Sequence, residues 1–221
     1  KVELTRTYLI KSKTLWSLMS KYANILSIER HRINIDGNGV RTLVCFGGCP
    51  LYCEYCLNPQ CHNIGSHVSY STVKLLNEVS VDNIYFMATN GGITFGGGEP
   101  IMQSDFIAEF CDICPNEWDI AVETSLNISS DKVIQILPYI SSWIIDIKDI
   151  NSQIYRKYTK CDNKRVIENL MLLSELSLQK QCNIRVPLIL NYNTEDDLNK
   201  SIEYMRLLGF ENFDTFNYVL R

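Results

Sequence analysis

The sequence predicts a single α/β domain in which a parallel sheet winds into a partial (β/α)6 barrel. After about residue 40, short apolar runs alternate with amphipathic stretches. Such alternation implies βαβ units and a parallel sheet. The 221 residues also suit one domain of ordinary size, and no Pro/Gly linker, repeat or low-complexity tract divides them.

The expected elements follow one another along the chain as strand and helix in turn. Each expected strand is a short apolar run, and each expected helix is an amphipathic stretch between two such runs. The strands are Thr42–Phe46, Ile93–Phe95, Ile120–Glu123, Trp143–Lys148, Asn183–Leu188 and Phe213–Val219, and the helices lie near 71–80, 103–113, 130–137, 165–179 and 195–208.

Residues 1–24 are expected to form an N-terminal arm, and residues 25–221 the core domain. Residues 1–32 carry seven Lys/Arg against two Asp/Glu, whereas the remainder carries 14 against 23. A solvated helix face explains such a basic arm more often than an acidic partner does. An apolar stripe at helical spacing, typical of simple packing, runs through Leu15, Leu18, Met19, Tyr22 and Ile25.

Composition excludes several classes of protein. No apolar run approaches the ~18 residues that a membrane span needs, and Lys11, Lys13 and Lys21 interrupt the apolar residues that a secretion signal would require. The acidic body lacks the basic stripe of a nucleic-acid reader. Nine cysteines at irregular spacing do not form a disulfide framework, and in a reducing cytosol they favour metal binding or catalysis. We therefore expect a cytoplasmic protein with no membrane or nucleic-acid partner.

Three cysteines are tightly clustered. Cys49, Cys53 and Cys56 follow the spacing C-x3-C-x2-C in a loop rich in Gly, Pro and Asn. Structural zinc sites usually use four Cys/His ligands in two separated pairs. A 4Fe-4S cluster has four irons, so three thiolates leave one iron open for a ligand. Cys61 as a fourth ligand fits no common ferredoxin spacing. Zinc and unligated buried cysteines are the alternatives that the ligand count disfavours.

Charged residues also occur inside the later strands. Asp146 and Lys148 are two residues apart in one apolar run and therefore share a face. Arg185 lies within another run, and Glu123 ends a third. Buried charges are costly unless they are paired or liganded. They therefore form either an internal ion-pair network or one end of a barrel that holds a polar ligand.

A glycine-rich segment follows the second expected strand. Residues 94–100 read Thr-Phe-Gly-Gly-Gly-Glu-Pro. Consecutive glycines allow positive φ and close approach of backbone to a ligand. Alone, such a segment is usually a turn, but here it follows the cysteine loop by one strand.

The cysteine spacing, with the aromatic Tyr55 before the third Cys, resembles the signature of the radical S-adenosylmethionine (SAM) superfamily. The glycine segment resembles the Gly-Gly-Glu-Pro motif of that family, which holds the methionine amino group of SAM. The resemblance implies one 4Fe-4S cluster whose open iron binds SAM. One electron then cleaves SAM to a 5′-deoxyadenosyl radical that abstracts hydrogen. The cofactor supplies this chemistry, and the protein positions it and excludes water.

Several further segments match a narrower group within this superfamily. They are Asn34–Thr42, Gly91–Thr94, Gly97–Pro100 with Gln103, Glu123–Ser125, Asp146–Lys148 and Ile184–Ile189. Through these segments the chain resembles the activating enzymes of glycyl radical enzymes, over about residues 25–195. The resemblance implies hydrogen abstraction from a backbone glycine of a large glycyl radical enzyme, with a flavodoxin- or ferredoxin-type electron donor.

Carried over by position, the resemblance assigns roles to individual residues. Asp146 and Lys148 would reach the SAM carboxylate, and Asp146 with Glu123 could hold a monovalent cation. Arg185 would line the ribose side, Tyr55 would flank the adenine, and Asp36 would meet the glycine loop of the substrate. The predicted SAM-binding residues are Tyr55, Cys56, Leu57, Gly97, Gly98, Glu99, Glu123, Asp146, Ile147, Lys148 and Arg185, and the cluster ligands are Cys49, Cys53 and Cys56.

Some positions depart from the family pattern. Asn38 replaces a usual Pro, Leu57 a frequent His and Leu126 a common Gly, and residues 217–219 read Asn-Tyr-Val where many relatives have Pro-Tyr-His. Two rival functions stay open. One is a radical SAM enzyme that modifies a peptide or metabolite. The other is a non-catalytic iron–sulfur protein, in which Lys148 and the glycine segment would have no role. Core packing is expected for Cys45, Cys111, Cys114, Cys161 and Cys182.

Overall fold

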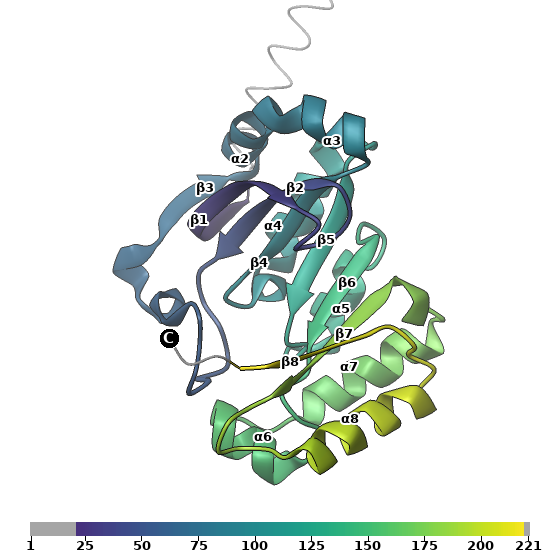
Figure 1. Ribbon diagram of the computed structural model, residues 1–221. Coiled ribbons are helices and arrows are strands. Elements are labelled where there is room, and N and C mark those ends of the chain that lie inside the picture. The colour runs from purple at the N-terminus through teal and green to yellow at the C-terminus, as the bar shows by residue number, and fades with distance from the viewer. Residues whose placement is uncertain (1–20, 219–221) are drawn as a thin grey trace, which may run out of the picture.

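The computed structural model describes residues 21–218, which fold around one eight-stranded sheet (Figure 1). The strand order is β3-β1-β2-β4-β5-β6-β7-β8. Six successive strands of this order run parallel: β2 (Val40–Phe46), β4 (Gly92–Gly97), β5 (Asp119–Thr124), β6 (Ser142–Asp146), β7 (Cys182–Leu188) and β8 (Phe213–Asn217).

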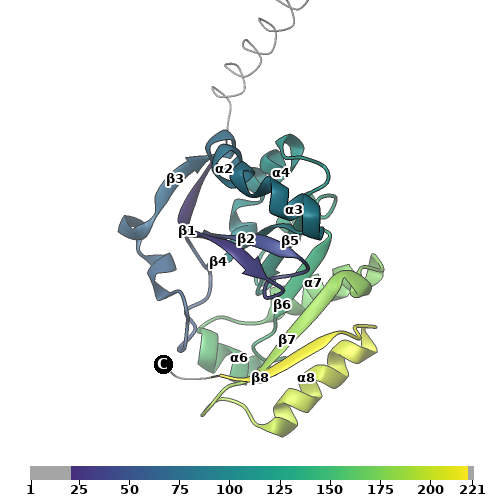
Figure 2. The ribbon, with the colours of Figure 1, turned by 45° about the horizontal axis from the view of Figure 1, so that its top comes forward.

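Helices connect the parallel strands and pack against the sheet (Figure 2). Polar side chains cap the amino ends of several of these helices. Asn151 caps α6, and Thr194 with Asp197 forms a capping box at the start of α8. The helices are α2 (Thr72–Val79), α3 (Asn83–Thr89), α4 (Ser104–Ile113), α5 (Ser130–Ile136), α6 (Ser152–Thr159), α7 (Lys164–Glu175) and α8 (Glu195–Leu207).

The predicted partial (β/α)6 barrel is confirmed, because all six expected strands and five expected helices are present. Two strands and two helices were not expected: β1 (Tyr22–Ile33), β3 (Val68–Ser71), α3 and α6. β1 pairs antiparallel with both β2 and β3, so it extends the sheet beyond the barrel strands.

The helical stripe predicted through Tyr22 and Ile25 is wrong at these two residues, because both belong to β1. Ala23 and Ile25 are buried while Tyr22 and Asn24 are exposed, which is the alternation of a strand. The other members of the stripe, Leu15, Leu18 and Met19, lie outside the described residues. The expected arm boundary at residue 24 falls within β1.

Arg41 joins the first parallel strands at their amino ends. Its guanidinium is fully buried and reaches Asp119 Oδ1 at 2.5 Å, the Ile93 carbonyl at 2.6 Å and Thr94 Oγ1 at 2.6 Å. These contacts link β2, β4 and β5. A buried guanidinium is stable only when its donors are paired in this way. The opposite, carboxyl end of the same strands carries the polar site.

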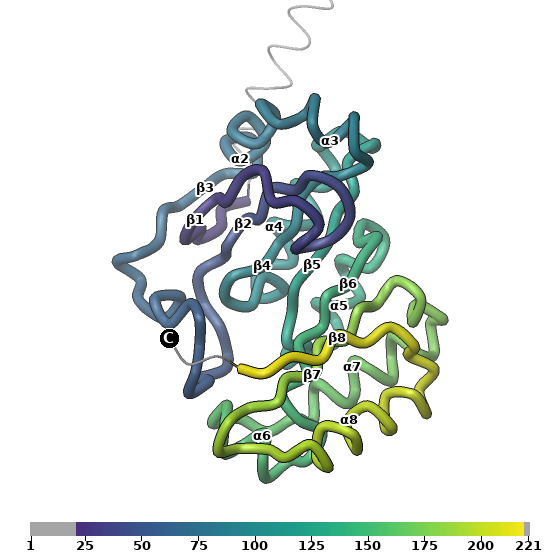
Figure 3. The backbone as a smooth tube through the Cα atoms, in the orientation of Figure 1, coloured from purple at the N-terminus to yellow at the C-terminus, as the bar shows by residue number. Residues whose placement is uncertain are grey.

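The segment between β2 and β3, residues 47–67, runs along that carboxyl end without a long helix (Figure 3). The end of the described chain returns beside it, where the Tyr55 and Tyr218 rings lie 6.3 Å apart. Among the helices of residues 21–218, none has the length and apolar character needed to cross a membrane.

Candidate active site

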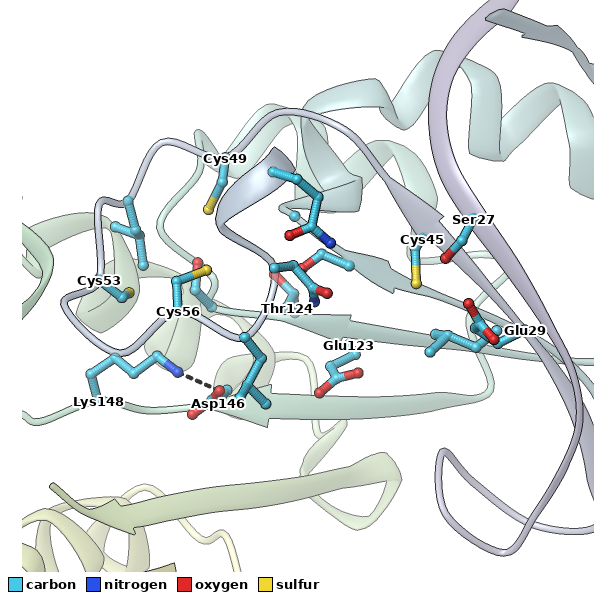
Figure 4. A pocket seen from close by; sticks show the side chains of 18 of the residues that line it. Ser27, Glu29, Cys45, Cys49, Cys53, Cys56, Glu123, Thr124, Asp146 and Lys148 are labelled. Carbon is cyan, nitrogen blue, oxygen red and sulfur yellow. Dashed lines mark hydrogen bonds and ion pairs between the residues drawn. The ribbon is translucent and has the colours of Figure 1, made fainter. Parts of the chain in front are cut away.

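An open cavity of about 380 Å³ lies at the carboxyl ends of the parallel strands (Figure 4). Cys49, Cys53 and Cys56 gather at one end of it, close to Lys148 and Asp146. The other end is formed by β1 and β2, where Ser27, Glu29, Arg32 and Cys45 face the same space. Glu123 and Thr124, from the end of β5, lie between the two.

The cysteine loop is fixed by backbone contacts with its neighbours. The Gly48 amide donates to the Cys61 carbonyl at 2.8 Å, and the Gly48 carbonyl accepts from the Glu99 amide at 2.8 Å. Further along, the Tyr52 amide donates to the carbonyl of Thr159 at the end of α6, at 2.9 Å. These contacts hold the loop between the β4 turn and α6, so that its thiols face the cavity.

The three thiols are free and partly exposed. Burial raises the pKa of the Cys53 thiol to about 11, although the nearby charge of Lys148 offsets part of this effect. Burial also raises the pKa of Cys49 well above its ordinary value. Because iron binds the thiolate, loading the site releases these protons.

This donor set fits a 4Fe-4S cluster. Cysteine thiolates are the usual ligands of such clusters, and three of them leave one iron facing the cavity. Within residues 21–218, no three His, Cys, Asp or Glu side chains are arranged to hold a single metal ion. Cys61 is buried below the loop and does not line this cavity.

Lys148 and Asp146 form an ion pair beside the thiols. Burial alone would lower the pKa of Lys148, but the charge of Asp146, with smaller effects of Tyr218 and Cys53, raises it well above the ordinary value, so the ammonium stays charged. Asp146 Oδ2 accepts from Lys148, whereas Asp146 Oδ1 is buried and has no hydrogen-bond partner. A buried acceptor without a protein partner is rare in folded proteins, and this one is available to a donor from a ligand or from water in the cavity.

The glycine turn after β4 allows close packing against the cysteine loop. A Cβ on Gly98 would lie 2.2 Å from the Gly48 carbonyl oxygen, and a Cβ on Gly97, which has a φ of +92°, would lie 2.7 Å from Cys45 Cα. The Asn58 side chain, which also lines the cavity, donates to the Gly97 carbonyl at 3.3 Å. Only glycine, which has no Cβ, therefore fits at positions 97 and 98.

Glu99 joins the glycine turn to the end of β5. Its fully buried carboxylate accepts from Thr124 Oγ1 at 2.8 Å and from the Ser125 amide and hydroxyl at 3.0 and 2.7 Å. Burial raises the pKa of Glu99, and these hydrogen bonds offset part of the effect. Its side chain does not line the cavity, so it holds the turn in position from behind.

The remaining charges are paired around the middle and far end of the cavity. Arg185 on β7 contacts Glu123 on β5 at 2.6 Å, and burial raises the pKa of Glu123 despite this partner. Arg32 binds the Asp36 carboxylate through two nitrogens. Asp36 is 3% exposed and does not line the cavity, whereas Arg32 does. The charges are therefore paired internally, as one of the sequence alternatives expects, and Glu123, Asp146 and Lys148 also line the cavity. That these charges bind a polar ligand stays a prediction.

The structure separates the predicted SAM-binding residues into two groups. Tyr55, Glu99, Ile147 and Arg185 do not line the cavity but support residues that do. Those that line it are Cys56, Leu57, Gly97, Gly98, Glu123, Asp146 and Lys148.

Tyr218 is a lining residue that sequence reasoning did not select. Its ring lies 5.8 Å from Lys148 Nζ, and it belongs to a group of tyrosine rings with Tyr55, Tyr158 and Tyr192. The sequence feature that could have indicated Tyr218 is its position in the Asn-Tyr-Val stretch, where many relatives have Pro-Tyr-His. Cys45 also lines the cavity, although core packing was expected for it.

Comparison with known proteins identifies the family of this chain. Residues 43–205 match the model of a family described as the radical SAM superfamily. The chain belongs to this superfamily. The matched segment includes the three cysteines, the glycine turn, Lys148 and Arg185.

The similar curated proteins are activating enzymes. The chain is 27% identical to the (2S)-3-sulfopropanediol dehydratase activating enzyme of Klebsiella oxytoca, with 84% of this chain and 81% of the relative covered. It is 25% identical to the trans-4-hydroxy-L-proline dehydratase activating enzyme of Clostridioides difficile, with 88% and 83% covered. It is 29% identical to pyruvate formate-lyase 2-activating enzyme of Escherichia coli (strain K12), with 68% and 62% covered. The chain is thus a radical SAM enzyme of the activating-enzyme type.

Solved structures share the fold. SuiB of Streptococcus suis superposes with a TM-score of 0.61 at 14% identity, over 77% of this chain and 37% of that one. The enzyme anSMEcpe, solved with bound AdoMet, gives a TM-score of 0.57 at 18% identity, over 77% and 49%. These similarities show that the chain shares the partial-barrel fold of the two structures. The radical SAM superfamily implies a 4Fe-4S cluster and SAM.

Proposed function

We propose that this radical SAM enzyme activates a glycyl radical enzyme by abstracting hydrogen from a backbone glycine of that large partner, in the cytoplasm. The names of the similar curated proteins support this substrate class. The observation that carries the proposal is one cavity that joins three free thiols to the Lys148–Asp146 pair and the glycine turn. When bound, the cluster and SAM together supply a carbon radical strong enough to take the hydrogen.

At the thiol end, the protein residues hold and orient SAM. Cys49, Cys53 and Cys56 ligate the cluster. Lys148, buried and charged, pairs with the carboxylate of SAM, and Asp146 Oδ1, which has no partner in the protein, accepts from the ammonium of SAM. Charge-assisted hydrogen bonds of this kind are short and about twice as strong as neutral ones. Together, Lys148 and Asp146 would hold the methionine part of SAM in one orientation beside the cysteine loop.

A monovalent cation beside SAM would have to share carboxylates that already have partners. Glu123 is paired with Arg185, and Asp146 with Lys148. Asp146 Oδ1 has no partner in the protein, but in the proposed site it accepts from the SAM ammonium, so a cation at this oxygen would compete with that ammonium.

At the far end, the cavity offers polar groups to an incoming loop. Arg32 faces the cavity and is held by Asp36, so Asp36 acts on the substrate through the Arg32 guanidinium. That guanidinium can donate to backbone carbonyls of an inserted loop. A glycine loop lacks a side chain at the target carbon, so it can enter a narrow opening and reach the reacting atoms.

Anaerobic reconstitution tests the proposal. The protein is loaded with iron and sulfide, reduced with photoreduced 5-deazaflavin, and assayed for 5′-deoxyadenosine and methionine from SAM. A glycyl radical enzyme of the same genome, labelled with Cα-deuterated glycine, is then added and followed by electron paramagnetic resonance. We expect a carbon-centred radical and deuterium in 5′-deoxyadenosine. Cleavage of SAM without deuterium transfer from any such enzyme would redirect the proposal to a peptide or metabolite substrate.

A further inference from the structure

A basic surface lies outside the barrel, next to the cysteine loop. Arg156, Lys160, Lys164 and Arg165 surround a hollow at the junction of α6 and α7, and all four are exposed. Residues 152–165 carry five Lys/Arg and one Asp, whereas the whole chain carries 21 Lys/Arg and 25 Asp/Glu. The positive charge is therefore local.

Helix electrostatics explain only part of this surface. Arg156 and Lys157 lie in the last turn of α6, where cations stabilise the carbonyl end of the helix. Lys164 and Arg165 occupy the first turn of α7, where cations are unfavourable. The first turns of α4, α5 and α8 instead carry acidic residues. Helix stability therefore does not explain the cations at the start of α7.

Internal ion pairs leave much of the charge available. Lys164 contacts Glu168 at 3.7 Å and Lys160 contacts Glu54 at 3.4 Å, both at exposed positions where such pairs contribute little. Among residues 21–218, Arg156 and Arg165 have no carboxylate within 4.0 Å. The guanidinium groups can therefore meet an anionic partner without first breaking a strong pair.

The surface is physically continuous with the cluster loop. The amides of Tyr52 and Glu54 donate to the carbonyls of Thr159 and Tyr158 at 2.9 and 3.2 Å, and Cys161 Sγ donates to the Pro50 carbonyl at 3.2 Å. Pro50 lines the basic hollow, while its neighbours Cys49 and Leu51 line the SAM cavity. The two spaces share no lining residue, so they open at different places on the surface.

We propose that Arg156, Lys160, Lys164 and Arg165 form the docking surface of an acidic one-electron donor protein that carries a low-potential flavin or iron–sulfur centre. This inference rests on the proposed function, because only the cluster-dependent reaction needs the electron. The donor loses one electron and the cluster gains it, with no bond made or broken. The contacts through Cys161 and Pro50 give the electron a short path from the docked protein to Cys49.

The surface suits an electron donor better than the substrate protein. A donor needs to approach the cluster closely but not to enter the cavity, and the basic surface meets both conditions. The substrate glycine must reach the cavity interior, and the polar far end of that cavity is built by β1 and β2, not by α6 and α7. Both proteins could then bind during one catalytic cycle.

Charge reversal tests the surface. In Lys164→Glu/Arg165→Glu, acidic residues enter the first turn of α7, where the helix dipole favours them, so the fold should be kept. The matched control, Lys180→Glu/Lys200→Glu, makes the same change of charge at exposed positions outside the basic hollow. Arg156→Gln/Arg165→Gln provides a second test variant without new acidic groups.

The measurement is the rate of cluster reduction in the reconstituted full-length protein without SAM, followed by absorbance bleaching after mixing with a reduced, acidic flavodoxin. We expect wild type to slow as salt rises, and Lys164→Glu/Arg165→Glu to be at least about 10-fold slower at low salt, with a weaker salt dependence. The control pair should match wild type. Reduction by 5-deazaflavin, which needs no protein docking, should be equal in all variants.

Several results would overturn the inference. Equal rates in the reversed variant and the control would show that the donor docks elsewhere. If both the reversed variant and the glutamine variant were also reduced more slowly by 5-deazaflavin, these residues would have a structural role. Unchanged reduction with weakened binding of a glycyl radical enzyme would assign the surface to that protein. Because the readout omits SAM and glycine, failure of the proposed function would appear separately, in the SAM cleavage assay.

Discussion

Replacing Lys148 by Met should weaken SAM binding and leave the cluster in place. Lys148 is 7% exposed and its ammonium stays charged, so in the proposed site it pairs with the SAM carboxylate inside a partly desolvated cavity. A charge-assisted hydrogen bond is worth about 1.5–3 kcal/mol, which corresponds to a roughly 10- to 150-fold increase in the dissociation constant of SAM. Met keeps the volume and apolar stem of Lys, so packing changes little.

Removing Lys148 also leaves Asp146 without its cation, and this could weaken binding of any anionic group. The double variant Lys148→Met/Asp146→Asn separates the two effects, because it removes both charges of the pair. If Lys148 contacts the SAM carboxylate directly, the double variant binds SAM at least as weakly as the single one, because it also lacks the charge of the Asp146 acceptor. If Lys148 only neutralises Asp146, the double variant recovers most of the affinity.

Isothermal titration calorimetry with SAM under anaerobic conditions measures the affinity, and iron analysis checks cluster occupancy in each preparation. The reasoning is refuted if Lys148→Met binds SAM as tightly as wild type. It is also refuted if affinity is lost only together with iron, because Lys148 would then stabilise the cysteine loop.

Other changes test separate parts of the site. Replacing any one of the three cluster cysteines by Ala should abolish stoichiometric iron binding, whereas Cys111→Ala and Cys114→Ala should keep it; equal loss in all would indicate a second cluster. Asp36→Ala should still cleave SAM but lower glycyl radical yield in the partner about 100-fold, because it releases the Arg32 guanidinium and misplaces the inserted loop; a normal spin signal would contradict this role. Burial raises the pKa of Asp149 to about 6, above its ordinary 3.8. The folded state therefore holds a proton that the unfolded state releases between about pH 4 and 6, and wild type loses stability as pH rises through this window. Asp149→Asn should raise the unfolding free energy of the cluster-free protein by about 3 kcal/mol at pH 8 and about half as much at pH 5, measured by urea denaturation; a difference independent of pH would exclude the titration.

The parallel strands β2, β4, β5 and β6 could be predicted because their apolar runs are buried on both faces. β1 could not. Its alternation covers only Ala23 and Ile25 before register shifts between Ile25 and Ser27 and between Glu29 and Arg32 interrupt it. α6 was missed for a different reason. Its buried residues include the tyrosines Tyr155 and Tyr158 within a polar, basic segment, so its apolar face is not evident from composition.

The site shows the same division between local and distant signals. The cysteine loop and the glycine turn are continuous segments, so their spacing alone indicated the chemistry. Arg32 and Asp36 are only four residues apart, but which of the two faces the cavity depends on the pairing of β1 with β2, whose register shifts between Glu29 and Arg32. Tyr218 lies beside Lys148 because β8 pairs with β7, and no local pattern indicates a contact between such distant parts of the chain. Asp36 was therefore expected at the substrate itself, whereas the structure presents Arg32 to the cavity and keeps Asp36 behind it.

Charge placement explains why this end of the sheet suits radical chemistry on a charged cosubstrate. Asp146 is the last residue of β6 and Glu123 the last but one of β5. Their carboxylates therefore lie at the edge of the apolar core, where they face the cavity. Each is paired internally, which offsets part of the cost of burial. Asp146 Oδ1 is the exception, since it is buried without a partner. The fold therefore bears a small electrostatic cost before any ligand arrives, and a bound ammonium would relieve it. Such preorganisation favours one orientation of the ligand, because any other orientation leaves the same oxygen unsatisfied.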